Sequence, residues 1–471
     1  MARTLGSLGG LACAALFLLS CDPAMVDSDG GAGDASSDAG GARDAAARDG
    51  GGVTPARILL IIADDLGVDT TAVYADIDGD GTPDDGRTYA PMPNVTQVCQ
   101  AGVRFTNAYA APTCSPTRAS VLTGRYGFRT GVGWALEATA GIEPTEVTLP
   151  QVLDGLATAN IGKWHLGTTA ELGRTSAPNT MGWDHYAGTL GGGLPSYDAW
   201  SRTENGVSEA ETRYATSANV DDAVAWLGGL EPDQPWLLWL AFNAPHNPLH
   251  LPPSSLHSDT GLSGTEADIG ARPADYYRAM VEAMDTEIGR LLSWLRDNGQ
   301  EDVHVIFMGD NGTTPMAVEA PQLGSRSKGT LYENGIHVPL CIAGPSVDAP
   351  GRTSGVLTHV VDLFSTIVDL AGGAVPADVT LDSVSLAPVL SGVSDEREHV
   401  YAEAFGSPNS DGRVARGARF KLLAFADGRE ELYDLQEDPL ETTDLLAAGS
   451  PSGDAAEAYA RLAAYLASRV P

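Results

Sequence analysis

Basic residues are scarce in this sequence. Lys and Arg together number 28 against 62 Asp and Glu, which gives a formal net charge of −34. Only three of the basic residues are lysines, at positions 163, 328 and 421. An acidic surface of this kind repels phosphate backbones, which argues against a nucleic-acid partner. An anionic substrate would need a local positive site or a bound cation to be held.

Long apolar runs are also missing, apart from one short run near the N-terminus. Arg3 precedes apolar residues from about Leu11 to Leu19, which are too few to span a membrane but typical of a signal peptide. The run ends in Leu18-Leu19-Ser20-Cys21, which resembles a bacterial lipobox. We therefore predict a lipoprotein signal peptide over residues 1–20 and a lipid on Cys21. The alternative is an ordinary signal peptide in which Cys21 has no role.

Large apolar side chains are almost absent from residues 21–54. From Asp22 to Thr54 the sequence has seven Asp and two Arg, and Asp, Gly and Ala dominate the segment. Such a segment cannot bury enough surface to fold, so we predict a flexible tether with a reach of about 30 Å. The lipid on Cys21 and this tether together predict a protein of the bacterial cell envelope, in the periplasm or on the outer surface. Such a protein would be held to the membrane by its lipid anchor only.

Cysteine is rare as well, with five residues in the chain. Cys13 would leave with the signal peptide and Cys21 would carry the lipid, so an odd number remains, Cys99, Cys114 and Cys341. Cys99 lies in a helical pattern and Cys341 in an apolar strand pattern. We predict that these two are small, separate core residues; a disulfide between them is the less favoured alternative.

The rest of the chain alternates predicted strands and helices. Residues 57–63 are a continuous apolar run, as expected for a strand buried on both faces, and residues 274–297 carry apolar side chains at helical spacing. This alternation predicts an α/β domain over residues 55–394, with a large mixed, mostly parallel sheet flanked by helices. Shorter strands and a terminal helix predict a smaller antiparallel subdomain over residues 395–471. Further strands are predicted at 236–242, 303–308, 338–343, 399–404, 413–425 and 431–433, and further helices at 93–100, 119–122, 148–156, 217–227, 360–370 and 454–468.

Acidic side chains follow two of the predicted buried strands. The first strand runs into Asp64-Asp65, and the strand at 303–308 runs into Gly309-Asp310-Asn311-Gly312. In open α/β sheets, sites form outside the carboxyl ends of strands, so these two segments would meet. Their oxygens suit a hard cation. Taken singly, each has a plainer interpretation, helix capping for Asp64-Asp65 and a turn for the second segment.

One segment carries a specific catalytic motif. Cys114-Ser115-Pro116-Thr117-Arg118, continued by Leu122-Thr123-Gly124-Arg125, resembles the signature of the type I sulfatases. In that family a formylglycine-generating enzyme oxidises the cysteine to formylglycine, whose hydrate carries two hydroxyls on one carbon. The resemblance implies that Cys114 is converted, that one hydroxyl attacks sulfur and that the other later expels sulfate. The alternative is an inert buried cysteine in a turn.

Six further segments resemble motifs of the same family and follow in the family's order. The resemblance extends from about residue 55 to the C-terminus and implies an alkaline-phosphatase-like fold. The segments are 63–67 (ADDLG), 161–167 (IGKWHLG), 243–248 (NAPHNP), 309–312 (GDNG), 328–339 (KGTLYENGIHVP) and 432–439 (LYDLQEDP).

The resemblance also assigns a metal site. It implies that one divalent cation, Ca²⁺ in preference to Mg²⁺, is bound by Asp64, Asp65, Asp310 and Asn311. An oxygen of the converted Cys114 would join these ligands.

Basic and imidazole side chains take the remaining roles that the resemblance implies. Arg118 would hold the formylglycine hydrate, and Lys163 and Lys328 would clamp the sulfate oxygens. His246 is the candidate general acid at the leaving oxygen, and His165 is the candidate base for sulfate release.

The sequence therefore predicts a sulfatase that hydrolyses an aryl or carbohydrate sulfate monoester. One alternative is a formylglycine-dependent phosphonate or phosphodiester hydrolase, although those relatives tend to have His at the position of Asn311. Another is a calcium-binding surface lipoprotein in which Cys114 is never converted. The substrate stays open, and we expect the pocket rim to come from residues 186–200 and 312–326.

An acidic insertion at residues 76–85 departs from the family pattern. Asp76, Asp78, Asp80 and Asp84, with a turn glycine, resemble a calcium-binding loop that lacks the usual closing Glu. A second calcium site and a solvated Asp/Gly turn are equally compatible with this segment.

Overall fold

The computed structural model describes residues 56–75, 85–137, 140–393, 397–408 and 411–469. The predicted signal peptide, Cys21, the tether and the calcium loop of Asp76, Asp78, Asp80 and Asp84 lie outside these residues. Within the described ranges, none of the helices is both long enough and apolar enough to cross a membrane.

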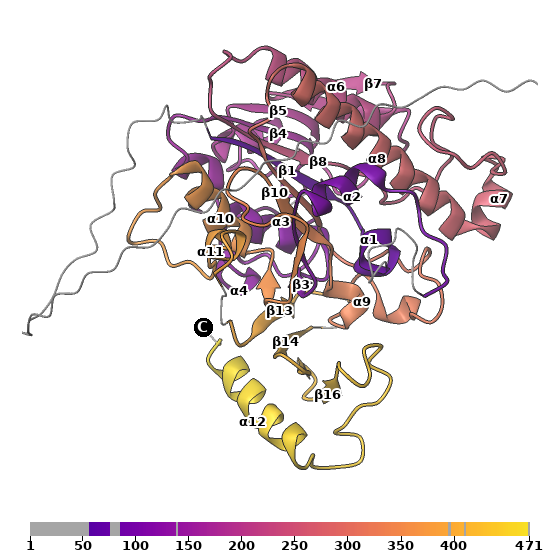
Figure 1. The fold of residues 1–471 in the computed structure, drawn as a ribbon, viewed down its shortest axis with the longest axis vertical. Coiled ribbons are helices and arrows are strands. Elements are labelled where there is room, and N and C mark those ends of the chain that lie inside the picture. Colours follow the sequence, from indigo (N-terminus) through magenta and orange to yellow (C-terminus); the bar gives the residue numbers. More distant parts are fainter. Residues whose placement is uncertain (1–55, 76–84, 138–139, 394–396, 409–410, 470–471) are drawn as a thin grey trace, which may run out of the picture. The chain divides into compact units, whose positions relative to one another are not determined.

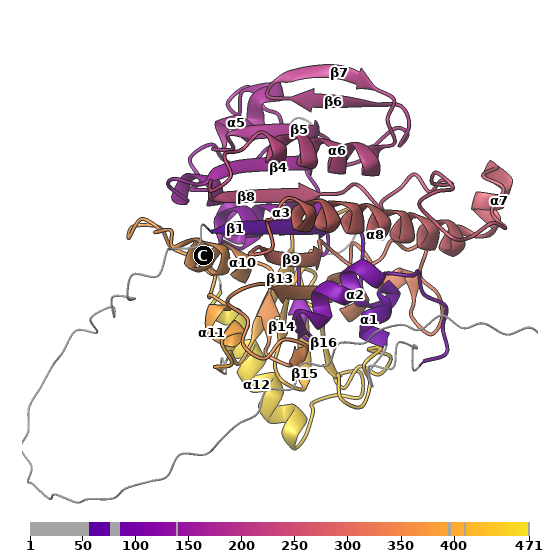
Figure 2. The ribbon, with the colours of Figure 1, turned by 45° about the horizontal axis from the view of Figure 1, so that its top comes forward.

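A ten-stranded sheet forms the centre of the protein (Figure 2). Its middle strands β9, β1, β8, β4 and β5 run parallel, and antiparallel pairings occur toward both edges. The large mixed sheet that the sequence predicted is therefore confirmed. In spatial order the strands are β11 (Arg352–Ser354), β2 (Gly102–Phe105), β10 (Leu340–Ala343), β9 (His304–Gly309), β1 (Arg57–Ala63), β8 (Trp236–Ala241), β4 (Ala157–Lys163), β5 (His185–Thr189), β6 (Trp200–Glu204) and β7 (Val207–Glu211).

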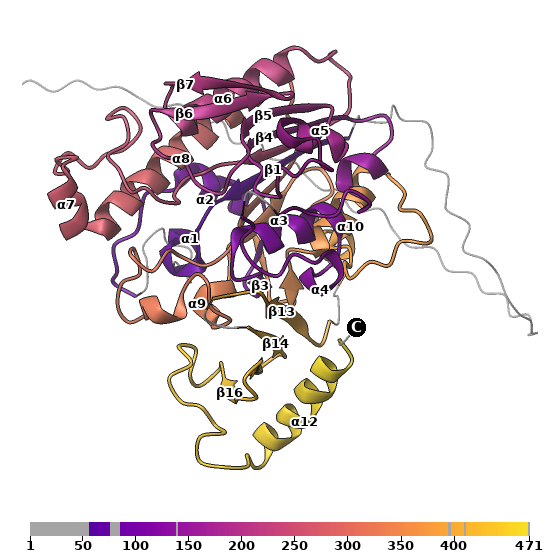
Figure 3. The same ribbon diagram turned by 180° about the vertical axis from the view of Figure 1, so that it is seen from behind.

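Strand β1 shows why its sequence is apolar at every position. Leu59 and Ile61 belong to the core under α2 (Pro93–Gln100), α6 (Ala215–Gly228) and α8 (Pro273–Asp297). The alternate residues Ile58 and Leu60 belong to a second core under α3 (Cys114–Thr123) and α10 (Asp362–Ala371). Figures 1 and 3 show the protein from opposite sides, so that a different one of these two helical layers lies in front of the sheet in each figure. A strand covered on both faces needs apolar side chains on both.

Short elements complete the main domain. The prediction of a helix over residues 148–156 was wrong, because only the 3₁₀ turn Leu149–Val152 forms there. Leu153 leaves the helical conformation and Gly155 has a φ of +84°, so the chain turns directly into β4. The other short elements are Val68–Thr70, α1 (Ala72–Ala75), β3 (Ala108–Tyr109), α4 (Gly127–Thr130), Arg174–Ser176, α5 (Ala177–Thr180), α7 (Glu266–Ala271), Gly324–Arg326, α9 (Glu333–Ile336), β12 (Thr358–His359) and α11 (Ala387–Leu390).

A separate four-stranded antiparallel sheet follows near the C-terminus. Its strands are β13 (Val400–Ala404), β14 (Gly412–Arg416), β15 (Phe420–Phe425) and β16 (Glu430–Asp434), and α12 (Asp454–Ala467) packs on it through Leu462 and Leu466. The sequence predicted one strand over residues 413–425, whereas the structure has a hairpin. Gly417 donates to the Phe420 carbonyl and closes a tight turn that the apolar pattern does not reveal.

The prediction for Cys99 and Cys341 was wrong. Both are buried, as expected, but they form a disulfide between α2 and β10 with their Cα atoms 5.1 Å apart. The two cysteines are 242 residues apart in sequence. Helix and strand periodicity report only local structure, so neither pattern could show that α2 packs beside β10.

A buried ion cluster joins the small sheet to the main domain. Lys421 on β15 is fully buried and lies 3.0 Å from a Glu333 oxygen and 2.8 Å from a Glu441 oxygen. Burial and the charge of Glu333 raise the pKa of Glu441 to about 7, although Lys421 opposes the shift. Glu333 begins α9, five positions after Lys328. The cluster therefore fixes the segment that carries Lys328 against the C-terminal sheet.

We expect Lys421→Met to destabilise the protein by about 3–5 kcal/mol, because the buried Glu441 and the partly buried Glu333 lose their cation. The loss should be larger at pH 8 than at pH 5. Carboxyl groups whose folded-state pKa is raised contribute less stability as the pH rises through that pKa. Thermal unfolding at both pH values measures the effect. Arg461→Met, at an arginine of α12 whose side chain is 64% exposed, is the matched control. Equal losses in the two variants would contradict a structural role for the cluster.

Candidate active site

Four neighbouring parallel strands bring most of the predicted site residues to one edge of the sheet. In the strand register Ala63 lies opposite Gly309, Ile62 opposite Ala241, and Ala241 opposite Gly162. The segments that follow these strands therefore start side by side, as expected at the carboxyl ends of parallel strands. The residues brought there are Asp64 and Asp65 after β1, Asp310 and Asn311 after β9, His246 after β8, and Lys163 and His165 at the end of β4.

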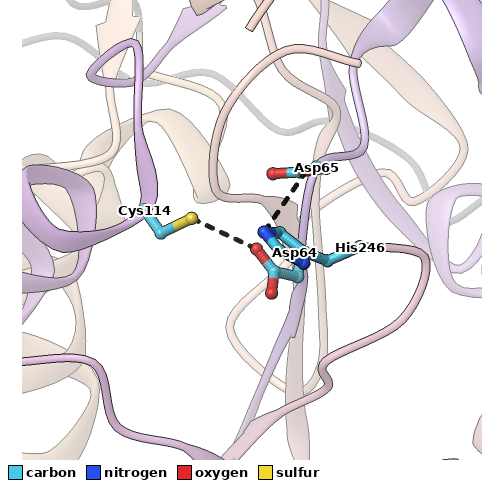
Figure 4. Close-up of side chains that lie close together, drawn as sticks. All are labelled: Asp64, Asp65, Cys114 and His246. Atoms are coloured by element: carbon cyan, nitrogen blue, oxygen red, sulfur yellow. Dashed lines mark hydrogen bonds and ion pairs between the residues drawn. The ribbon is translucent and has the colours of Figure 1, made fainter. Parts of the chain in front are cut away.

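Cys114 enters the same region from the N-terminus of α3. Its side chain is buried, with Sγ 3.3 Å from an Asp64 oxygen (Figure 4). The same Sγ atom lies 3.3 Å from Lys163 Nζ. Burial, assisted by the charge of Asp64, raises the pKa of the Cys114 thiol to about 12. An unmodified thiol at this position is therefore neutral at physiological pH and a poor nucleophile.

Asp64 and Lys163 form a buried ion pair beside the cysteine. The Nζ atom of Lys163 lies 2.5 Å from Asp64 Oδ2, and both side chains are fully buried. Burial alone would raise the pKa of Asp64. Lys163, followed by His246, Arg118 and Lys328, reverses this effect and holds the pKa well below its ordinary value. Asp64 is therefore ionised at physiological pH.

Asp65 adopts an uncommon backbone conformation. Its φ of +67° lies in the left-handed region, where a non-glycine residue persists only if its surroundings hold it. Its N–H donates to Asp310 Oδ1 at 3.0 Å, and the hydroxyl of Tyr277 donates to its carbonyl at 2.7 Å. Oδ1 of its side chain lies 2.5 Å from Lys328 Nζ and accepts from Asn311 Nδ2 at 2.8 Å. These contacts fix where the second carboxylate points.

Arg118 and Asp310 form a second fully buried pair. An Arg118 nitrogen lies 2.8 Å from Asp310 Oδ2, and another donates to the Lys163 carbonyl at 3.0 Å. Burial and the charge of Asp64 raise the pKa of Asp310 to about 6, against the opposing effect of Arg118. Both oxygens of Asp310 already accept hydrogen bonds, one from Asp65 and one from Arg118. Asp310 therefore positions its neighbours in addition to any ligand role.

The two predicted histidines are largely buried. His246 Nδ1 lies 2.8 Å from the Asn247 carbonyl, which directs Nε2 toward Asp65 Oδ2 at 3.9 Å. His165 Nε2 lies 3.2 Å from the Leu136 carbonyl. Burial lowers the pKa of both rings, that of His165 to about 2 with help from Lys163 and Arg118. The His165 ring is therefore neutral and can accept a proton, whereas for His246 the charges of Asp64 and Asp65 oppose the effect of burial and favour the protonated ring.

The residues present fit a divalent cation. One ligand atom from each of Asp64, Asp65, Cys114 and His246 lies within 4.8 Å of the others (Figure 4). Within the described part of the chain, Asp65 Oδ2 and Asn311 Oδ1 are buried acceptors without a hydrogen-bond partner. A cation would satisfy both, and carboxylate and amide oxygens are ligands of hard cations. The position of His246 makes it a further possible ligand of this cluster. The sequence predicted only a role as a general acid for this residue.

Supporting residues that sequence reasoning missed hold these groups in place. The Ser115 hydroxyl donates to the His165 carbonyl at 2.8 Å and accepts from the Leu136 N–H. Ser115 lies inside the cysteine motif, which could have identified it, whereas nothing in the sequence around Tyr277 signals its contact with Asp65. The predicted rim segment 186–200 contacts the histidines through its glycines. A Cβ on Gly192 would lie 2.5 Å from the His165 ring, and one on Gly193 would lie 3.4 Å from that of His246.

Comparisons with known proteins agree with this fold. The sulfatase family model matches residues 56–374, and a model described as N-sulphoglucosamine sulphohydrolase, C-terminal, matches residues 323–464. The chain is 30% identical over 334 residues to YdeN of Escherichia coli, an uncharacterized sulfatase, covering 65% of this chain and 58% of YdeN. It is 30% identical over 424 residues to human arylsulfatase D, covering 73% and 70% of the two chains. The crystal structure of Ps i-CgsB matches with a TM-score of 0.69 at 26% identity, covering 84% of this chain and 89% of that one.

The chain therefore belongs to the sulfatase family, a family of sulfuric ester hydrolases. The solved relatives also share the alkaline-phosphatase-like fold that the sequence predicted.

We expect the protein to retain a divalent cation and Asp65→Asn to lose most of it, because the variant removes one charge from the buried cluster. Elemental analysis after dialysis measures the ion, and the change in melting temperature on adding a chelator gives a second readout. Asp297→Asn, at an aspartate whose side chain is 71% exposed, is the control and should behave as wild type. A wild-type protein without retained metal and without a response to chelator would refute the site.

Proposed function

We propose that this chain hydrolyses a sulfate monoester of an aryl or carbohydrate alcohol to the alcohol and inorganic sulfate. The observation that carries the proposal is the position of Cys114, at the N-terminus of α3 and in contact with both Asp64 and Lys163. The helix N-terminus and the lysine supply positive charge where an oxyanion would form. Membership of the sulfatase family supports the same reaction.

The nucleophile that we propose is a formylglycine made from Cys114 by a formylglycine-generating enzyme. The Sγ atom stands where an oxygen of the converted residue would lie. A neutral buried thiol is a poor nucleophile, whereas the hydrate of an aldehyde supplies one hydroxyl to attack sulfur and a second to expel sulfate. Arg118, buried behind Asp310, would compensate the carboxylates around this group.

Ca²⁺ is the cation that we propose, with Mg²⁺ as the alternative. Asp64, Asp65, Asp310 and Asn311 offer oxygen ligands, which suit these ions better than zinc. When bound, the ion would polarise a sulfate oxygen and stabilise the charge of the transition state.

The basic and imidazole groups would then act on the substrate directly. Lys163 and Lys328 carry the positive charges closest to the carboxylates of the site and would bind sulfate oxygens. His246, with Nε2 directed into the cluster, would hold a proton for the leaving oxygen. His165 would take a proton from the formylglycine hydroxyl when sulfate is released.

The experiment that tests the proposal starts with mass analysis of the peptide that contains Cys114, from protein made in a host with the converting enzyme. We expect the mass of an aldehyde or its hydrate, and measurable turnover of an aryl or sugar sulfate. Cys114→Ala should lose essentially all turnover. Lys163→Ala should lose about 10²-fold or more, the scale for one preorganised electrostatic contact.

Two outcomes would contradict the proposal in different ways. An unmodified Cys114 in protein from the native host would favour the calcium-binding lipoprotein. Faster turnover of phosphodiesters than of matched sulfate esters would favour the phosphonate and phosphodiester branch. Asn311 argues against that branch.

Retention of a surplus calcium that is lost on Asp78→Asn and Asp80→Asn would support the acidic insertion as a second site.

We also propose that the protein is exported to the bacterial cell envelope and anchored by a lipid on Cys21. Cys21→Ala should block lipid attachment and either leave the signal peptide uncleaved or release the protein from the membrane fraction. Incorporation of a labelled fatty acid and membrane partition measure this. Cys13→Ala, inside the predicted signal peptide, is the matched control. Unchanged labelling and partition in Cys21→Ala would contradict the anchor.

A further inference from the structure

A cleft of about 440 Å³ lies beside Lys328. We call it the lysine cleft. Main-domain residues on its wall include Trp134, Lys328, Gly329 and Tyr332, and the C-terminal sheet contributes Phe425 at the end of β15 and Arg429 just before β16. The lysine cleft is therefore lined by both the main domain and the C-terminal sheet. One of its lining residues, Lys328, also contacts Asp65 in the site described above.

Trp134 ties the lysine cleft to the reaction site. Its ring packs beside Gly329, where a Cβ would lie 3.4 Å from the indole, and Gly329 has a φ of +86° that favours glycine. Two positions further along the chain, Leu136 contacts both His165 and Ser115. The segment from Trp134 to Leu136 thus connects His165, which the Ser115 hydroxyl contacts, with Gly329 next to Lys328. A substrate whose sulfate reached Lys328 would extend its alcohol part into this space.

The charge of the lysine cleft is opposite to that of the whole chain. Lys328 and Arg429 are its charged lining residues, and within the described ranges no carboxylate lines it. A cleft with this lining in a chain of net charge −34 favours an anion. Arg429 is half exposed and stacks its guanidinium 3.8 Å from the centre of the Phe425 ring. It also pairs with Glu431, which accepts hydrogen bonds from the hydroxyls of Tyr332 and Tyr433. Its Nε atom also lies 3.9 Å from an Asp427 oxygen, so these contacts hold the guanidinium in place while half of the side chain remains exposed.

Aromatic side chains provide the other surface. Trp134, Tyr332 and Phe425 are all partly exposed and surround the same space. The C–H face of a sugar ring packs favourably on such surfaces, whereas a sulfated sugar ring presents its anions at the edge. Apolar faces combined with a positioned arginine suit a ring that carries charge at its periphery.

From these observations we propose that the lysine cleft binds the alcohol part of the substrate, and that this part is a saccharide with a second anionic group paired to Arg429. The second group is a sulfate or a carboxylate, because both accept two parallel hydrogen bonds from a guanidinium. The proposal rests on the proposed sulfatase function and adds its substrate class.

The test compares kcat/KM for three saccharides of equal size: one with a single sulfate, one with two sulfates, and one with a sulfate and a carboxylate. Wild type should prefer at least one of the doubly charged sugars over the singly charged one by roughly 10- to 100-fold, the range for a hydrogen bond to a charged group. Arg429→Gln should remove most of this preference through KM, and Arg429→Lys should restore part of it. Arg296→Gln, at an arginine of α8 whose side chain is 60% exposed, should keep the full preference. Which doubly charged sugar is preferred identifies the second anion.

Calorimetric binding of the same sugars to Cys114→Ala separates this proposal from the sulfatase function. Tight binding that depends on Arg429 without any turnover in wild type would overturn the activity and leave the cleft assignment standing. Turnover with equal use of the three sugars, or a preference that Arg429→Gln leaves intact, would overturn the cleft assignment alone. Circular dichroism of each variant confirms that it is folded.

Discussion

Burial of charge at the ends of the central strands is the constraint on which the rest of the structure depends. Three carboxylates there are fully buried, and a buried ion costs several kcal/mol unless a partner compensates it. Each carboxylate has its own cation at 2.5–2.8 Å. Loss of any one member would leave its partner uncompensated, so the six groups behave as one unit. The pairs are Asp64–Lys163, Asp65–Lys328 and Asp310–Arg118.

This unit is possible only because the sheet and one unusual turn act together. The parallel register starts the segments after β1, β4, β8 and β9 at the same edge. The left-handed conformation of Asp65 then lets two consecutive carboxylates face different cations. Such a conformation costs on the order of 1–3 kcal/mol. The hydrogen bonds from Asp65 to Asp310 and from Tyr277 to Asp65 offset that cost and make the turn part of the site.

Much of this arrangement could be predicted from the sequence, and what was missed has a common physical cause. Strand β1 was predicted with its observed bounds because burial on both faces leaves an unmistakable apolar run. The clustered positions of Asp64 and Asp310 followed from the rule that strand ends meet. The Cys99–Cys341 disulfide and the contact of Tyr277 with Asp65 depend on packing between distant segments, which local periodicity does not encode. The hairpin inside residues 413–425 was missed because its turn has one glycine and no other turn signal.

The charges of the site also explain how so acidic a chain could attract an anion. Three carboxylates and three cations, Lys328 among them, leave the cluster neutral, so a divalent cation would make it locally positive, and Arg429 places a further cation on the wall of the lysine cleft. In the proposed function, reaction and recognition draw on different parts of the fold. The strand ends of the main sheet hold the reacting groups, while the C-terminal sheet supplies Phe425 and Arg429 to the cleft wall. The segment from Lys328 to Glu333 belongs to both, because its first residue contacts Asp65 and its last contacts buried Lys421. If the lysine cleft binds the alcohol part, as proposed, a change in the C-terminal sheet can alter which alcohol is bound while the pairs around Cys114 stay intact.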